Sequence, residues 1–272
     1  MPDETVRGRV RVVKSPAEWP VAFFDDEYLK MYLPQLTPER TEQEVDFIEG
    51  ALAPAPGDAV LDLACGFGRH AIRMAKRGFR VTGVDFNPRY LEIAAAEARS
   101  AGVTVEWVAC DMRALDFSAR FDRAYSYFTS FGYYSDDENE AVLARIARAL
   151  RPDGRLLLDV MNRDWLLTHP QQRTWNQRED GALIMEEASL DLRNSRVISR
   201  LTMIEPDKGT GPAKQFDLRA YTCAELTALM RRHGFEVREV WGGPDRGAYS
   251  TESRRLILLA ERAGAAAGLP AC

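Results

Sequence analysis

Three acidic residues, Asp62, Asp85 and Asp111, stand at or just beyond the ends of apolar runs in the first half of the chain. The first of these runs leads into a Gly-x-Gly-x-x-Ala turn over residues 66–71. Glycines at a tight turn accept unusual backbone angles and leave the backbone N–H groups open to a ligand, because no Cβ blocks the approach. Carboxylates beside such a turn can accept hydrogen bonds from ribose hydroxyls or from an adenine amino group. The pattern predicts a site for an adenosine-bearing ligand.

The same glycine pattern, with Asp85 downstream, also matches the fingerprint of dinucleotide-binding enzymes. Asp62 distinguishes the two interpretations, because its carboxylate would repel a pyrophosphate and attract the cationic amino group of an amino-acid tail. Asp111 and Met112 together offer a carboxylate and an apolar side chain, which suit the amino group and the ring face of adenine. These residues favour an adenosine ligand with a cationic tail, and an NAD(P)-dependent oxidoreductase is the alternative.

Apolar strands alternate with helices in the segment that contains these acids. We expect strands at 59–63, 79–84, 103–109, 121–127 and 155–160. We expect helices from Thr37 or Thr41 to Leu52, over 71–77, over 90–100, and from a cap at Asp136 or Asp137 to Leu150. This rhythm predicts a Rossmann-like, mostly parallel sheet that binds ligands outside the carboxyl ends of its strands. Gly66, Asp85, Asp111 and Phe128 all fall at that edge.

The rhythm changes after residue 162, where runs typical of strands at 174–177, 182–192, 196–205 and 213–218 follow one another without helices. A helix capped by Thr222 and two closing strands at 237–241 and 255–260 come next. The predicted fold is α/β, a Rossmann-like seven-stranded mostly parallel sheet with an inserted antiparallel β-sheet cap. We divide the chain into an N-terminal arm or lid (1–36, with a short edge strand or an extended arm at 6–13), a ligand-binding domain (37–162 and 219–262), the cap (163–218) and a disordered tail (263–272).

The segment Asp62-Leu63-Ala64-Cys65-Gly66-Phe67-Gly68 resembles the first motif of class I S-adenosylmethionine-dependent methyltransferases, and the resemblance covers residues 41–260. Ala64 stands where many members have glycine, which adds one methyl group to the turn. Asp85 is similar in place to the family's ribose-binding acid and Asp111 to its adenine-contacting acid, while 151–156 resembles the turn into the fifth strand. The resemblance implies S-adenosyl-L-methionine as cofactor, and implies these cofactor-binding residues: Asp62, Ala64, Cys65, Gly66, Gly68, Asp85, Phe86, Asn87, Asp111, Met112, Tyr127 and Phe128. Arg40 and His70 are further candidates for contact with the cofactor tail.

The segment 127–134, Tyr-Phe-Thr-Ser-Phe-Gly-Tyr-Tyr, lacks the Asn/Asp-Pro-Pro-Tyr/Phe signature of enzymes that methylate exocyclic amines of nucleic-acid bases. It resembles the Thr-Ser-Phe-Gly-Tyr stretch of small-molecule N- and O-methyltransferases, including some of specialised metabolism. The resemblance implies methyl transfer to an amine or hydroxyl of a small-molecule acceptor. RNA or protein methylation and a non-catalytic S-adenosylmethionine-binding regulator are the alternatives within the same fold.

Methyl transfer from a sulfonium is an in-line displacement, so alignment contributes roughly 7 to 11 kcal/mol. A general base adds roughly 10²- to 10⁴-fold, which is the smaller effect. His169, shortly after the fifth strand, and Tyr28 are the candidates for that base. Tyr28 belongs to an aromatic stretch at 19–32 that suits a lid, where it shares a helical face with Tyr32. The expected acceptor-binding residues are Phe24, Tyr32, Phe131 and Arg173.

The overall composition restricts the partners. The 36 basic and 41 acidic side chains give a net charge of −5. The chain therefore lacks the excess of positive charge that is typical of proteins that bind nucleic acid. The four cysteines are scattered without metal-ligand spacing, so no metal is expected. No apolar run approaches the roughly 18 residues of a membrane span, and the charged N-terminus does not resemble a signal peptide. We therefore expect a cytoplasmic protein with no membrane partner, in which the N-terminal arm or the cap could mediate a homodimer.

Overall fold

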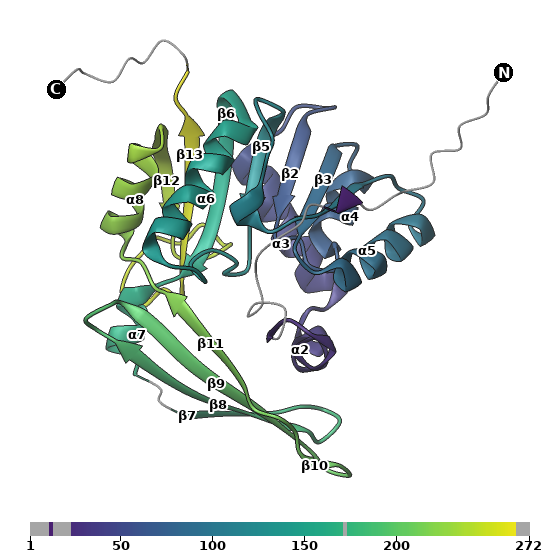
Figure 1. Ribbon diagram of the computed structural model, residues 1–272, viewed down its shortest axis with the longest axis vertical. Helices are drawn as coiled ribbons and strands as arrows, with labels where there is room; N and C mark the ends of the chain where they lie inside the picture. The colour runs from purple at the N-terminus through teal and green to yellow at the C-terminus, as the bar shows by residue number, and fades with distance from the viewer. Residues whose placement is uncertain (1–10, 13–22, 171–172, 265–272) are drawn as a thin grey trace.

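The computed structural model describes residues 11–12, 23–170 and 173–264. The strands of the central sheet are β1 (Arg11–Val12), β2 (Ala59–Leu63), β3 (Arg80–Asp85), β4 (Glu106–Ala109), β5 (Phe121–Ser126), β6 (Leu150–Met161), β12 (Phe235–Trp241) and β13 (Arg255–Arg262). They lie in the order β1-β4-β3-β2-β5-β6-β13-β12, in the upper part of the molecule in Figure 1.

Seven strands of this sheet confirm the expected architecture. Strands β2 to β6 pair in parallel, and β13 runs antiparallel to both of its neighbours, β6 and β12. The two-residue strand β1 adds a parallel edge beside β4. It is the described part of the edge strand expected at 6–13, whose other residues lie outside the described ones. The parallel strands bring the ends of β2, β3 and β5 to one edge of the sheet.

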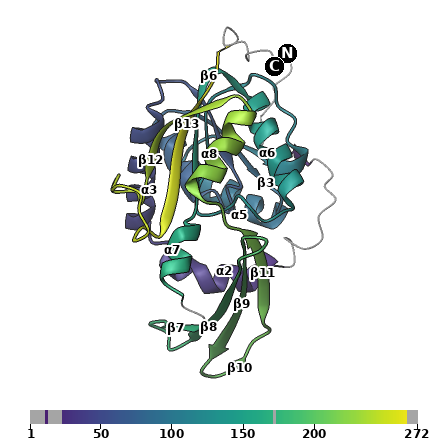
Figure 2. The same ribbon diagram turned by 90° about the vertical axis from the view of Figure 1, so that its left-hand side faces the viewer.

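Helices cover both faces of the sheet, as Figure 2 shows. They are α3 (Pro38–Leu52), α4 (Arg69–Lys76), α5 (Pro88–Ser100), α6 (Asp136–Ala149) and α8 (Cys223–Arg232). The first three share one buried apolar cluster, in which Ile48, Ala71 and Leu91 pack against the sheet. The last two share another, represented by Ile146 and Leu226. Burial of these two apolar faces holds the central domain together.

Two helix starts show how side chains fix the boundaries. Thr37, rather than Thr41, caps α3 by accepting a hydrogen bond from the backbone N–H of Arg40. The prediction that Asp136 or Asp137 caps α6 is wrong. Ser135 is the cap, because its hydroxyl accepts from the N–H of Glu138 while the Glu138 carboxylate accepts from the N–H of Ser135, which together form a capping box. Strand β6 also begins earlier than expected, at Leu150, which pairs with Phe121.

The segment after β6 forms the expected antiparallel sheet, which projects below the central domain in Figure 1. It contains β7 (Arg173–Gln177), β8 (Leu183–Asp191), β9 (Arg196–Glu205), β10 (Gly209–Thr210) and β11 (Lys214–Arg219). Helix α7 (Arg163–Thr168), which the sequence analysis did not predict, connects β6 to this sheet. We call the sheet β7–β11 the cap sheet.

Helix α2 (Asp26–Tyr32) packs on the cap sheet through a third apolar cluster. Phe23 and Met31 are buried there against residues of β8, β9 and β11, and the rings of Phe23 and Phe216 lie 5.4 Å apart in an edge-to-face arrangement. Lys214 Nζ of β11 donates to Asp25 Oδ2 at 2.6 Å. These contacts attach the helix to the cap sheet.

The same helix is also tied to the central domain. Asn87 Nδ2, at the start of α5, donates to the backbone oxygen of Phe24 at 2.7 Å. The hydroxyl of Tyr90 donates to the backbone oxygen of Asp25 at 3.2 Å. Helix α2 thus bridges the cap sheet and the edge of the central sheet where β2 and β3 end.

The expected division of the chain remains a prediction at its ends, because most of the arm (1–36) and of the tail (263–272) lies outside the described residues. Within the described ranges, every helix is too short or too polar to cross a bilayer.

Candidate active site

A cavity lies at the carboxyl ends of β2, β3 and β5, with α2 on its far side. It encloses about 890 Å³, its open mouth included. Eleven of the sequence-predicted residues line it: Phe24, Tyr28, Ala64, Cys65, Gly66, His70, Asp85, Phe86, Met112, Tyr127 and Phe128. The topology therefore brings together residues that are more than a hundred positions apart in the chain. They come from the turn after β2 and the start of α4, from the ends of β3 and β5 and the segment after β4, and from α2 with the residues directly before it.

The turn between β2 and α4 shows why glycine is needed twice. Gly66 has a φ of +55°, and a Cβ built on it would meet no atom within 4 Å, so the space beside it is open. Gly68 has a φ of +78°, and a Cβ on it would lie 2.5 Å from the Trp107 ring. Gly66 thus leaves room for a ligand, whereas Gly68 allows α4 to pack closely on the sheet. Ala64 adopts a φ of +60° without being glycine, a conformation that stores backbone strain.

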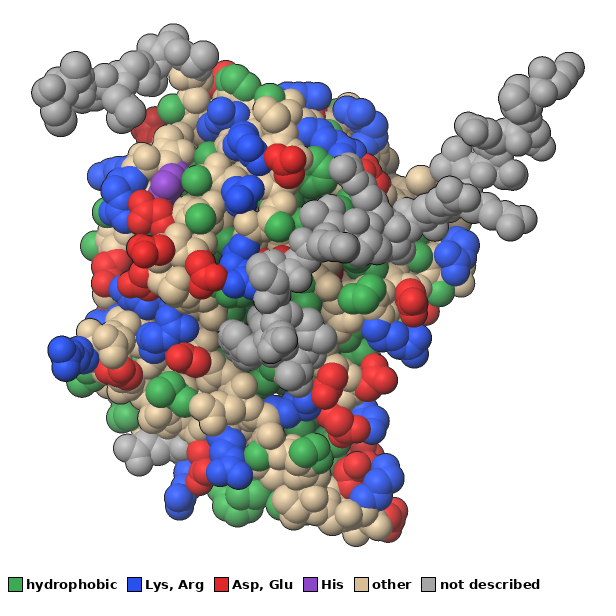
Figure 3. Space-filling view, viewed as in Figure 1, with side chains coloured by type: hydrophobic (Ala, Val, Ile, Leu, Met, Phe, Trp, Pro, Cys, Tyr) green, Lys and Arg blue, Asp and Glu red, His purple; other side chains and the backbone are tan. Residues whose placement is uncertain are grey.

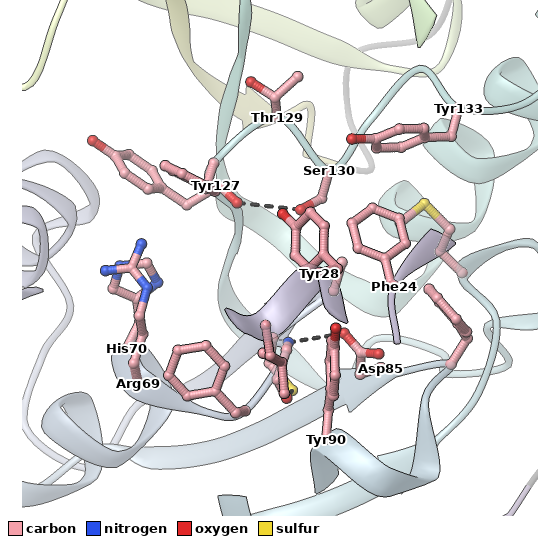
Figure 4. Close-up of a pocket in the computed structure, with 18 of the residues that line it drawn as sticks. Phe24, Tyr28, Arg69, His70, Asp85, Tyr90, Tyr127, Thr129, Ser130 and Tyr133 are labelled. Atoms are coloured by element: carbon pink, nitrogen blue, oxygen red, sulfur yellow. Dashed lines mark hydrogen bonds between the residues drawn. The ribbon is translucent and has the colours of Figure 1, made fainter. Parts of the chain in front are cut away.

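Asp85 is a buried carboxylate in the cavity wall, at the end of β3 (Figure 4). Its Oδ2 accepts from the N–H of Gly66 at 2.8 Å and its Oδ1 from the N–H of Asn87 at 2.9 Å. Burial raises the pKa of Asp85 to about 6, although both N–H groups favour the ionised form. Since each carboxylate oxygen has a second lone pair, Asp85 can still accept two hydrogen bonds from a ligand diol.

Asp62 is buried outside the cavity wall. Its Oδ2 has no hydrogen-bond partner among the described residues, and burial raises the pKa of its carboxyl to about 7. Burial disfavours the ionised form of Asp62, although the nearby Tyr125 hydroxyl and the positive charge of Arg69 favour it. A contact of Asp62 with the cofactor stays a prediction.

Asp111 is fully buried and already has partners. The backbone N–H of Arg113 donates to Oδ1 at 2.8 Å, and the Arg113 guanidinium forms an ion pair with Oδ2 at 2.8 Å. Asp111 therefore caps the short turn that follows β4, and the described cavity wall contains its neighbour Met112 instead. The contact of Asp111 with adenine stays a prediction. Asn87 and Gly68 are the N-cap residues of α5 and α4 beside the cavity, and their contacts with the cofactor also stay predictions.

Arg69 is a cavity residue that the sequence analysis missed. It lies at the start of α4, pairs with Glu44 and donates to Thr41 Oγ1 at 3.2 Å. Its Nη2 is buried and has no hydrogen-bond partner among the described residues. An unpaired guanidinium N–H that borders a cavity is suited to a ligand carboxylate. A basic residue directly after a glycine turn carries no special spacing, so the sequence offered no signal for this role.

The candidate tail residues His70 and Arg40 lie near the same point. His70 lines the cavity, and its Nε2 lies 2.9 Å from Glu44 Oε2. Burial lowers the pKa of His70 to about 4, so the ring is neutral at physiological pH. Arg40 donates to Glu44 Oε1 at 3.0 Å, and its guanidinium lies 5.3 Å from the centroid of the Phe128 ring.

The loop after β5 is held in a strained shape. Phe128 and Thr129 both have positive φ values, +70° and +56°, although neither is glycine. Asp159 of β6 compensates for this strain, because its Oδ2 accepts from the N–H of Phe128 at 2.8 Å and its backbone oxygen accepts from Thr129. Arg255 of β13 forms an ion pair with the same carboxylate. The backbone of this loop turns Phe128, Thr129 and Ser130 into the cavity wall.

Aromatic rings form the side of the cavity next to α2. The ring of Phe24 lies 4.7 Å from that of Tyr28 and 5.5 Å from that of Tyr133, and in Figure 4 these rings stand near Ser130. Burial raises the pKa values of Tyr28 and Tyr133 above their usual range. Both phenols therefore keep their protons at physiological pH. Tyr32 stacks on Tyr28 at 4.5 Å, as the shared helical face predicts, but it is not part of the described cavity wall.

Three predicted residues lie away from the cavity. His169 follows α7 rather than the strand, so its ring stacks on Trp165 at 5.0 Å and its Nε2 lies 3.3 Å from Glu252. Arg173 is an exposed residue of β7. Phe131 is buried against Tyr221. The expected roles of these residues in proton removal or acceptor binding find no support in their positions.

Among the described residues, no group of three or more His, Cys, Asp and Glu side chains is arranged to hold a metal ion.

Comparison with known proteins gives the following relatives. Residues 60–154 match the family model described as a methyltransferase domain. A putative methyltransferase of Geobacillus sp. (strain WCH70) is 39% identical over 102 residues, which are 37% of this chain and 41% of that protein. A glycine/sarcosine N-methyltransferase of Halorhodospira halochloris is 32% identical over 133 residues, 48% of this chain and 50% of that protein. The chain thus spans half or less of the length of these two relatives.

The fold has a counterpart among solved structures. The crystal structure of an S-adenosylmethionine-dependent methyltransferase from Clostridium acetobutylicum ATCC 824 superposes with a TM-score of 0.75 and 16% sequence identity. The superposition covers 88% of this chain and 99% of the other. At this level of identity, the likeness concerns the fold.

Proposed function

We propose that this chain, which carries a class I S-adenosylmethionine-dependent methyltransferase domain, transfers a methyl group from S-adenosylmethionine to an amine or hydroxyl of a small-molecule acceptor. One observation carries the proposal: a single cavity joins the open turn at Gly66 and the buried carboxylate of Asp85 to an aromatic wall on α2. A relative named as a glycine/sarcosine N-methyltransferase supports an amine as one acceptor class.

The residues of the cavity fit the cofactor. Asp85 would accept hydrogen bonds from the ribose hydroxyls, and Arg69, whose Nη2 has no partner among the described residues, would bind the carboxylate of the amino-acid tail. Phe86 and Met112 offer apolar surfaces to the adenine ring. Gly66 keeps the space between these contacts free of a side chain. When bound, S-adenosylmethionine supplies an activated methyl group on a sulfonium.

On the acceptor side, the protein contributes mainly position and exclusion of water. Phe24, Tyr28 and Tyr133 surround the cavity with ring faces, which attract a positive charge and replace water. Alignment of the acceptor contributes roughly 7 to 11 kcal/mol. The hydroxyls of Tyr28 and Tyr133 stay protonated, so they orient the acceptor by hydrogen bonding rather than by removing a proton.

A small-molecule acceptor also agrees with the surface. On the face in Figure 3, Lys and Arg side chains alternate with Asp and Glu side chains in small groups. A nucleic acid needs a continuous basic stripe, because most of its binding energy comes from phosphate contacts. The mixed charges on this face and the cavity next to α2 favour an acceptor that is enclosed.

Calorimetry with S-adenosylhomocysteine and NAD⁺ would test the cofactor. We expect S-adenosylhomocysteine to bind and NAD⁺ to give no heat of binding, and the reverse result would refute the proposal. Turnover would then be measured as formation of S-adenosylhomocysteine with a panel of small amines, phenols and alcohols, beside a tRNA and a peptide. Turnover with only the tRNA or the peptide would contradict the small-molecule acceptor.

A further inference from the structure

The face of the cap sheet that packs against α2, which we call the inner face, carries a carboxylate that has no role in the proposed function. Glu186 of β8 lies opposite Leu201 of β9, and residues on this face, such as Ile184 and Leu201, belong to the apolar cluster around α2. The Oε1 atom of Glu186 accepts from the hydroxyl of the fully buried Ser199 at 2.5 Å. The hydrogen bond fixes the carboxylate on the side of the sheet that faces α2.

Glu186 has no basic partner among the described residues, whereas its neighbour does. Glu187 points to the opposite face of β8, because side chains alternate along a strand. There it forms an ion pair with Arg173 at 2.9 Å and is about half exposed, at 47% of its side-chain surface. Of these two carboxylates, that of Glu186, on the inner and more apolar face, is thus the one without an ion pair among the described residues.

Aromatic rings connect Glu186 to the cavity. The ring of Tyr32 stacks on that of Tyr28, which lines the cavity together with Tyr133. Burial, followed by the nearby charge of Glu186, raises the pKa of Tyr32. Both tyrosines pack against the apolar cluster that contains Ile184 and Leu201, which share the inner face of the cap sheet with Glu186. Glu186 is therefore on the face of the cap sheet that packs against these two rings, and Tyr28 borders the space proposed for the acceptor.

On the basis of the proposed function, we propose that Glu186 and the stacked rings of Tyr28 and Tyr32 form a recognition subsite for a positively charged group of the acceptor. A carboxylate beside aromatic faces is a complementary environment for an organic cation, because both attract positive charge at short range. The charged group is distinct from the nucleophile, since a nitrogen that attacks the methyl group needs a free lone pair. The acceptor class is a small molecule with a cationic group and a separate amine or hydroxyl.

The test uses choline and its uncharged isostere 3,3-dimethylbutan-1-ol, which differ only in a quaternary nitrogen in place of a carbon. Both are titrated by ligand-observed NMR into the full chain saturated with S-adenosylhomocysteine. We expect choline to bind at least tenfold more tightly than the alcohol. The variant Glu186→Gln, which can keep the hydrogen bond to Ser199, should lose this preference, whereas Glu186→Asp should keep most of it.

Glu187→Gln is the matched control, because it removes the same charge from the adjacent residue on the outer face. It should leave the preference for choline unchanged. Equal affinities of the two probes for the unmodified chain, or a full preference in Glu186→Gln, would overturn the proposed subsite. The prior titration with S-adenosylhomocysteine separates the two hypotheses: failure of that titration refutes the proposed function, whereas normal binding without a preference for choline refutes the subsite alone.

Discussion

At the proposed cofactor end of the cavity, the wall comes mainly from one continuous part of the chain, from the turn at Gly66 to the end of β3 at Asp85. At the proposed acceptor end, the wall comes from α2, the loop after β5 and, beyond them, the cap sheet. The cofactor end consists of backbone groups and buried charges held by short hydrogen bonds. The acceptor end consists of rings that pack on one another across segments far apart in sequence.

This difference implies a division of labour. A site made of buried charges and fixed N–H groups costs little to organise when a ligand binds, so it suits a ligand that is the same in every turnover. A wall made of packed rings on a bridging helix can change shape when the cap sheet or α2 shifts. We therefore expect changes at the cofactor end to alter cofactor affinity strongly, and changes at the acceptor end to leave that affinity almost unchanged.

Asp85→Ala should have the largest effect on cofactor affinity. It removes two charge-assisted hydrogen bonds to the ribose, each worth roughly 1.5 to 3 kcal/mol, so the Kd for S-adenosylhomocysteine should rise by roughly 10²- to 10⁴-fold. Calorimetry measures the change. Asp116→Ala is a suitable control, because Asp116 is an acid that is 83% exposed and pairs with Arg148. An unchanged Kd in Asp85→Ala would mean that the ribose lies elsewhere.

The cofactor end could be predicted from the sequence because its geometry follows from local rules. Parallel strands end at a common edge, so acids and glycines directly after apolar runs must meet there. The alternation of strands and helices predicted the central sheet, and the run of strands without helices after residue 162 predicted the cap sheet. Gly66, Asp85 and Phe86 were found in this way. Arg69 was not, because its unpaired nitrogen depends on how Thr41 and Glu44 approach it from α3.

The acceptor end was less predictable for two physical reasons. The contribution of Tyr133 depends on the positive φ values of Phe128 and Thr129, which nothing in their residue types indicates. The position of His169 depends on where α7 ends, and that of Arg173 on the face of β7 to which its side chain points. A shift of a few residues in either element is therefore enough to move a side chain away from the cavity. Such features are decided by packing between distant segments rather than by a short pattern.

Arg69→Met would test the second contact at the cofactor end. Without the guanidinium, the Kd for S-adenosylhomocysteine should rise by roughly tenfold, because a charge-assisted hydrogen bond to its carboxylate is lost. The affinity for 5′-methylthioadenosine, which lacks the amino-acid tail, should stay within about twofold of the original value. Competition binding measures both ligands on the same sample. If both affinities fall equally, Arg69 supports the fold of the turn instead of binding the tail.

The pH dependence of cofactor affinity would show whether the charge of Asp85 matters. Its pKa in the free protein is about 6, and hydrogen bonds from ribose hydroxyls favour the ionised form. Binding must therefore release a proton at low pH, so affinity is full well above pH 6 and falls about tenfold per unit below it. The Kd at pH 5 should be roughly tenfold higher than at pH 7. Asp85→Asn should bind weakly and without this slope; a persistent slope would assign the effect to another group.

The smallest effect is expected where α2 meets the cap sheet. Lys214→Met removes the ion pair with Asp25, in which the lysine is only 8% exposed and the aspartate 44%. Loss of a partly exposed pair costs about 1 kcal/mol, so amide hydrogens of α2 should exchange about fivefold faster, while those of β2 and β3 keep their rates. Hydrogen exchange with mass spectrometry resolves these segments, and Lys208→Met, which breaks an exposed pair with Glu205, serves as the control. Equal acceleration in α2, β2 and β3 would show that the two ends of the cavity open as one unit, and the division between them would then be wrong.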